Sequence, residues 1–197
     1  IPVIDVSGSM QQGSPSALDV AVSLGMYLAE RNKSAFKNLG MTFNTNPRWF
    51  TIPEGTVRQR EHAVKGSDGQ MCGSTDLDKA MCMIIDTAVK NRIAPDDMPT
   101  NLIILSDMEF NTGSYGYGTT TVAERTRARF KLAGYNVPGI VWWNIASRHG
   151  TTPVRHNEHG MALVSGFSPS IMTSLLGGEM TPEKIMIKAI MVDRYAH

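Results

Sequence analysis

The sequence predicts an α/β fold: a doubly wound, mostly parallel six-stranded sheet with one antiparallel edge strand and helices on both faces, in a Rossmann-like arrangement. Three observations lead to this expectation. Short apolar runs alternate along the chain with stretches that carry apolar residues at helical spacing. The runs at residues 102–105 and 140–143 are continuously apolar, as is typical of parallel strands that are covered on both faces. Residues 38–44 and 48–52 lie too close together for a crossover helix, so we expect an antiparallel hairpin.

The composition is that of an ordinary globular protein, and we expect one domain over residues 1–197. Of the 197 residues, 42% are hydrophobic and 19% are charged, and the formal net charge is +1. This charge balance argues against a dedicated nucleic-acid surface, and no apolar run approaches the roughly 18 residues of a membrane helix. The two cysteines form no C-x-x-C pair, which favours a reducing, cytoplasmic setting. Because the chain does not begin with methionine, we expect it to be a fragment of a longer protein.

The first elements follow one another as strand, helix, hairpin and helix. Residues 1–4 form an apolar run that ends at Asp5, and a polar loop follows it. A helix is expected over residues 17–30, with Ser16 as its N-cap. After the hairpin, the pattern allows a short helix over residues 57–65. A strand that leads into a helix is the first half of a βαβ unit.

The clearest helix begins after Thr75 and Asp76, one of which is expected to cap it. Its apolar stripe follows helical spacing without a gap, at Leu77, Ala80, Met81, Ile84, Ile85 and Ala88. Further elements are expected at residues 101–107 (strand), 121–133 (helix), 137–145 (strand), 161–165 (strand), 168–176 (helix) and from 181 onward (helix).

Side chains with oxygen atoms stand at three places where elements begin or end. Asp5, Ser7 and Ser9 follow the first strand in D-x-S-x-S spacing, Thr75 precedes the clearest helix, and Asp107 ends the fourth strand of the parallel core. If the first and fourth strands are neighbours, the two carboxylates converge at the edge of the sheet where such folds bind ligands. All five are hard oxygen ligands, so the sequence predicts a site for Mg²⁺, or else Mn²⁺ or Ca²⁺.

Such a site suits a binding module. A divalent cation would remove the repulsion between the two carboxylates, and five side chains leave room for one outside oxygen. A protein partner that offers an Asp or Glu carboxylate would supply that oxygen and a further negative charge. No catalysis is then required, and we expect no enzyme. The alternative is a Mg²⁺-dependent phosphohydrolase with Asp5 as nucleophile, although the usual D-x-D pattern and supporting lysine are not evident.

Three motifs together resemble a known family. D-V-S-G-S at residues 5–9, G-S-T-D at residues 73–76 and S-D at residues 106–107 look like the metal-ion-dependent adhesion site (MIDAS) of a von Willebrand factor type A (vWA) domain. Order and spacing agree over essentially the whole chain. Within that superfamily, the chain is similar to an uncharacterised intracellular family in three further stretches, at residues 103–110, 142–144 and 163–168.

The resemblance implies a role for each candidate ligand. Ser7, Ser9 and Thr75 would bind the metal through their hydroxyls, while Asp5 and Asp107 would bind it directly or through water. The vWA domain of the similar family follows a helical region like that of the Ro ribonucleoproteins (Ro/TROVE-like). A corresponding helical part is therefore expected before this chain, and it makes RNA a candidate partner within a ribonucleoprotein-type assembly.

Two features qualify this expectation. Many vWA domains place glycine after the last aspartate of the site, where this chain has Met108 and Glu109. The helix expected over residues 121–133 carries basic residues that form either a solvated face or a contact for an acidic partner such as RNA, namely Arg125, Arg127, Arg129 and Lys131. Asp19 and Asp86 lie within helical stretches and are expected to be solvated.

Overall fold

A computed structural model describes residues 1–44, 46–66, 77–108, 120–146 and 161–166. Its centre is a six-stranded sheet with the order β3-β2-β1-β4-β5-β6. The strands are β1 (Pro2–Asp5), β2 (Leu39–Phe43), β3 (Trp49–Thr51), β4 (Asn101–Ser106), β5 (Gly139–Asn144) and β6 (Met161–Ser165). All neighbouring strands are parallel except β2 and β3, so β3 is the antiparallel edge strand. The predicted sheet is confirmed.

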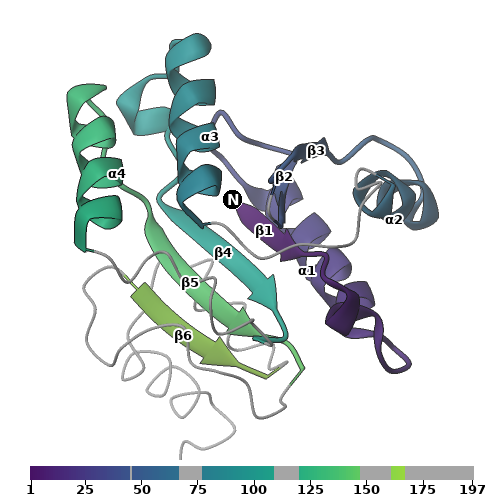
Figure 1. Ribbon diagram of the computed structural model, residues 1–197. Coiled ribbons are helices and arrows are strands. Elements are labelled where there is room, and N and C mark those ends of the chain that lie inside the picture. Colours follow the sequence, from purple (N-terminus) through teal and green to yellow (C-terminus); the bar gives the residue numbers. More distant parts are fainter. Residues whose placement is uncertain (45, 67–76, 109–119, 147–160, 167–197) are drawn as a thin grey trace, which may run out of the picture.

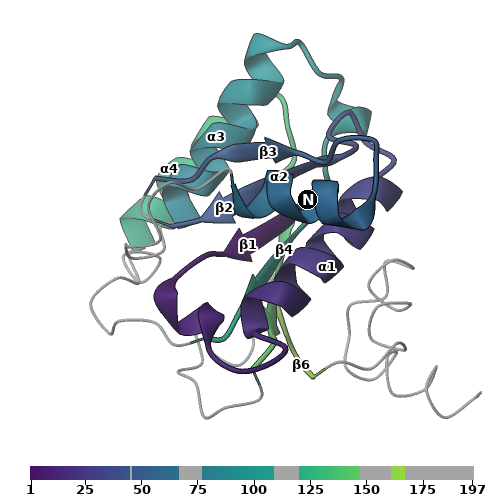
Figure 2. The same ribbon diagram turned by 90° about the vertical axis from the view of Figure 1, so that its right-hand side faces the viewer.

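Helices cover both faces of this sheet (Figures 1 and 2). The helices α1 (Ala17–Arg31) and α2 (Val57–Lys65) contribute to one apolar cluster, and α3 (Leu77–Lys90) and α4 (Thr120–Leu132) contribute to the other. Figure 2 shows α1 and α3 on opposite sides of the strands. None of the helices in the described part of the chain is long and apolar enough to cross a membrane.

The continuous apolar run in β4 is explained by these two clusters. Side chains alternate between the faces of a strand, so Leu102 and Ile104 join the cluster with α3 while Ile103 and Leu105 join the cluster with α1. All four are buried. A strand that is covered on both faces must be apolar at every position, which is the pattern that predicted a parallel sheet.

Local signals place the helices. The side chain of Ser16 accepts a hydrogen bond from the backbone of Asp19, and the Asp19 carboxylate accepts one from the backbone of Ser16. This capping box confirms Ser16 as the N-cap of α1. In α3 all six residues of the predicted apolar stripe are buried. The cap expected at Thr75 or Asp76 lies outside the described residues.

The structure adds two short helices that the sequence did not predict. The polar loop after Asp5 includes a 3-10 helix, η1 (Gly8–Gln11), and a second one, η2 (Pro95–Asp97), precedes β4. Cys82 lies beside the apolar stripe of α3, where it is half-buried and contacts Arg129. The helices expected at residues 168–176 and from 181 onward lie outside the described part.

Candidate metal centre

The loop after β1 folds back on Asp5. The backbone N–H of Ser7 donates a hydrogen bond to Asp5 Oδ1 (2.9 Å), and the hydroxyls of Ser7 and Ser9 lie 3.1 Å apart. The 3-10 turn of η1 begins at Gly8 and brings the second serine back beside the first. The D-x-S-x-S spacing therefore places one carboxylate and two hydroxyls together at the carboxyl end of β1.

The end of β4 contacts this loop directly, since β1 and β4 are parallel neighbours. The Ser106 hydroxyl donates a hydrogen bond to Asp5 Oδ2 (2.6 Å), and the backbone N–H of Asp107 donates one to the sulfur of Met10 (3.2 Å). Ser106 and Met10 were not among the predicted site residues. The S-D motif and the position directly after Ser9 were the available signals, but only the strand pairing shows what these side chains contact.

Both carboxylates are almost completely buried, with Asp5 1% exposed and Asp107 3% exposed. Burial raises the pKa of the Asp5 carboxyl, and the negative charge of Asp107 adds to the rise, whereas hydrogen bonds from Ser106 and Ser7 oppose it. The cost of placing two carboxylates in one poorly hydrated place is what a cation would remove.

The donor set fits a hard divalent cation. Two oxygens at adjacent corners of an Mg²⁺ octahedron, with bonds of about 2.1 Å, lie about 3 Å apart. The hydroxyls of Ser7 and Ser9 are hydrogen-bonded to each other at 3.1 Å, a separation that two neighbouring ligands of such an ion could keep, and both residues are half-buried rather than sealed from solvent. No group of three or more Asp, Glu, His or Cys side chains that could hold a metal occurs among the described residues. The candidate centre instead combines two carboxylates with hydroxyls.

The predicted ligands are thus brought together in part. Asp5, Ser7, Ser9 and Asp107 stand on the neighbouring ends of β1 and β4, at the switch point of the strand order. Thr75 lies outside the described residues. The identity of a bound ion, and the role of each ligand, remain predictions.

Met108 stands where many vWA domains have glycine, and its backbone is left-handed, with φ of 59°. A residue with a side chain adopts this conformation at a cost of about 1–2 kcal/mol. The Met108 side chain is 1% exposed, and its N–H donates to the Ser106 hydroxyl (3.0 Å). This left-handed backbone is thus held by the bond to Ser106, while the side chain fills part of the core.

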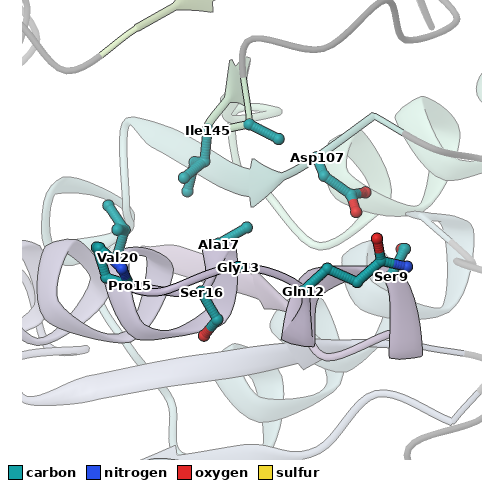
Figure 3. Close-up of a pocket in the computed structure, with 10 residues that line it drawn as sticks. Ser9, Gln12, Gly13, Pro15, Ser16, Ala17, Val20, Asp107 and Ile145 are labelled. Carbon is teal, nitrogen blue, oxygen red and sulfur yellow. The ribbon is translucent and has the colours of Figure 1, made fainter.

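A cavity of about 200 Å³ opens beside the centre. Ser9 and Asp107 belong to its lining, together with residues from the start of α1 and the end of β5 (Figure 3). The site is thus bordered by a hollow that is large enough for a side chain.

Sequence comparison places the chain among proteins of unknown role. The sequence model of one family, described as "Domain of unknown function (DUF7788)", matches residues 1–194. The "Uncharacterized protein L728" of Acanthamoeba polyphaga mimivirus is 29% identical over 178 residues, which is 90% of this chain and 30% of that protein. The chain therefore spans less than a third of this relative.

Solved structures show a similar fold. The crystal structure of the Deinococcus radiodurans Ro protein (RSR) aligns with a TM-score of 0.62 and 18% identity, covering 90% of this chain and 34% of that one. Proximal thread matrix protein 1 from the mussel byssus aligns with a TM-score of 0.53 and 11% identity, covering 91% and 45%. At these identities the likeness is one of fold, and it agrees with the predicted vWA-like α/β architecture.

Proposed function

The chain belongs to the DUF7788 family, whose function is unknown, and from that premise we propose that it is a metal-dependent protein-binding module. The candidate centre would hold Mg²⁺, with Mn²⁺ or Ca²⁺ as alternatives, through Asp5, Ser7, Ser9, Thr75 and Asp107. One coordination position would be left for an Asp or Glu carboxylate of a partner protein. The observation that supports this proposal is the clustering of two buried carboxylates and two hydroxyls on adjacent strand ends.

The charge balance of the site favours an acidic ligand. Two carboxylates just balance the charge of a divalent ion, so the occupied site would carry no excess negative charge that repels a third carboxylate. The attraction would come from direct coordination of the ion at its open position. Ser7 and Ser9 are half-buried rather than sealed from solvent, so a ligand could reach the ion beside them.

The same geometry argues against the phosphohydrolase alternative. A nucleophilic carboxylate needs one oxygen that can reach the substrate. In Asp5, Oδ1 accepts a hydrogen bond from Ser7 and Oδ2 accepts one from Ser106, and the residue is 1% exposed. Both oxygens of this carboxylate are engaged within the fold, which fits a group that would orient and coordinate an ion better than one that attacks a substrate.

Calorimetric titration of the chain with Mg²⁺ and Mn²⁺ tests the metal centre. Asp107→Ala is expected to abolish measurable binding, because it removes a charged ligand. Asp96→Ala is the matched control, since Asp96 is an exposed carboxylate on η2, away from the centre. Far-UV circular dichroism should be unchanged in both variants. Equal metal affinity in Asp107→Ala and Asp96→Ala would overturn the proposal.

We extend the proposal to a cytoplasmic, ribonucleoprotein-type assembly, in which a helical region preceding this domain would bind RNA and this domain would contact proteins. On α4, Arg129 pairs with Asp86 (2.8 Å) and contacts the sulfur of Cys82, so this basic residue is already engaged within the domain. RNA retention by this chain alone, lost on neutralising Arg125 and Arg127, would contradict this division of roles.

A further inference from the structure

The cavity beside the candidate centre has a polar end and an apolar end (Figure 3). Ser9, Gln12 and Asp107 stand together at one end. Val20 and Ile145 line the other end, together with Pro15 and Ala17. Ala146 also belongs to the lining. The cavity thus begins at two of the predicted metal ligands and runs toward aliphatic side chains.

We propose that this cavity is a subsite of the metal centre that receives a branched aliphatic group carried on the same ligand as the metal-bound carboxylate. In a partner protein this group would be the side chain of a leucine, isoleucine or valine next to the acidic residue. The inference rests on the proposed function, because the carboxylate is what brings the aliphatic group to the entrance.

The position of the cavity supports this pairing. Ser9 and Asp107 belong both to the candidate centre and to the cavity wall, so a carboxylate at the ion lies at the cavity mouth. A group attached to that carboxylate can enter the cavity without a second point of attachment.

Size and polarity define the kind of group. The volume of about 200 Å³ exceeds the roughly 150 Å³ of an engineered apolar cavity that holds a benzene ring. It is smaller than the sites of about 300–1,000 Å³ that hold drug-sized ligands. A single aliphatic side chain fits this range. The residues at the apolar end carry no charge that would favour a polar side chain there.

The walls are held by the same contacts that build the centre. The backbone N–H of Ile145 donates to the carbonyl of Ser106 (2.9 Å), and Ser106 is the residue that bonds Asp5. On the opposite wall, the capping box between Ser16 and Asp19 holds the start of α1. A subsite with fixed walls loses little freedom when it is filled, so that aliphatic contacts add to affinity.

Two carboxylates test the proposal on the whole chain: acetate and 4-methylpentanoate, each titrated with Mg²⁺ present and followed by NMR. Each buried methylene is expected to tighten binding about three- to fourfold, so 4-methylpentanoate should bind at least about tenfold tighter than acetate. The methyl signals of Val20 and Ile145 should shift with 4-methylpentanoate and not with acetate. Chelator should release both.

The outcomes separate the subsite from the metal centre. If acetate binds with Mg²⁺ and 4-methylpentanoate binds no tighter, the subsite is wrong and the proposed function stands. If neither carboxylate needs Mg²⁺, the proposed function fails as well. Ala146→Leu should fill the cavity and reduce the tenfold preference to less than about twofold. Ala128→Leu on the exposed face of α4 is the matched control and should keep the preference.

Discussion

Ser106 is the residue through which the ends of β1 and β4 contact each other most closely. Its hydroxyl donates to Asp5 Oδ2 (2.6 Å) and accepts from the N–H of Met108 (3.0 Å). Because Ser106 is fully buried, water cannot replace either bond. Ser106 therefore sets the orientation of a carboxylate that we propose as a metal ligand.

Ser106→Ala is expected to weaken Mg²⁺ binding by about 10–100-fold, as the loss of a group that orients a metal ligand typically does. It should also lower the free energy of unfolding by about 1–3 kcal/mol, because one oxygen of Asp5 is left without its partner. Calorimetry and urea denaturation measure the two effects. Ser23→Ala on the exposed side of α1 is the control. Unchanged affinity in Ser106→Ala would contradict the orienting role.

At the residue scale, the sequence predicted the oxygen side chains but not what holds them. Asp5, Ser7, Ser9 and Asp107 were identifiable because they lie at the end of an apolar strand or within a few residues of it. The left-handed backbone of Met108 was not, because methionine rarely adopts it and its stabilisation comes from burial and from the bond to Ser106, which are tertiary contacts.

At the element scale, the helices were predictable where the signal is local. The capping box of α1 and the apolar stripe of α3 both lie within one helix or its first turn. The link between α1 and α2 was not predictable, because Asp19 and Lys65 are 46 positions apart. Asp19 was expected to be solvated, but its side chain is only 44% exposed and bonds Lys65 (2.6 Å).

This link predicts a pH dependence. The hydrogen bond from Lys65, followed by those from Ser16, lowers the pKa of Asp19 from 3.8 to about 2. Because the folded pKa lies below the unfolded value, the stabilisation is present above pH 3.8 and is lost as the pH falls toward 2. Asp19→Asn should therefore have a lower free energy of unfolding than the parent near pH 6. This difference in stability should become smaller toward pH 2. Asp96→Asn should show no such difference. If the stability difference between the parent and Asp19→Asn is the same at pH 6 and pH 2, the lowered pKa of Asp19 does not stabilise the fold.

The close approach of α1 to β1 gives a second prediction at this scale. A β-carbon on Gly25 would lie 2.6 Å from Ile4 Cδ1, inside the core. Gly25→Ala should therefore destabilise the protein by about 1–3 kcal/mol, although alanine favours the helix by about 1 kcal/mol. Ile4→Val removes the clashing methyl, so the double variant should be more stable than the sum of the two single changes, as measured by chemical denaturation. If the stability changes of the two single variants simply add in the double variant, α1 moves away from β1 in Gly25→Ala and the predicted clash with Ile4 does not occur.

At the scale of the whole molecule, the sheet order is what assembles the centre. The alternation of strands and helices predicted a parallel sheet, but the neighbourhood of β1 and β4 could only be assumed. Asp5 and Ser106, which bond each other, are 101 positions apart. Strands that pair over such a distance carry no local sequence signal of their pairing. The pairing follows from how the helices cover both apolar faces of the sheet.

A cation at the junction of β1 and β4 should stabilise the entire domain, because an unfolded chain does not hold the ligands together. At a Mg²⁺ concentration of about 100 times the dissociation constant, the gain is about 2.7 kcal/mol. Thermal denaturation with Mg²⁺, against sodium chloride of equal ionic strength, measures it. Asp107→Ala should show no gain. Equal melting temperatures of the parent in both salts would contradict binding to the folded state.

The central place of β1 has a consequence for biosynthesis. β1 is translated before every other strand, yet one of its edges pairs with β4. At about 5–20 residues per second, a ribosome needs several seconds to make the intervening stretch. During that time the nascent chain exposes an unpaired apolar edge, which is the kind of surface that chaperones cover.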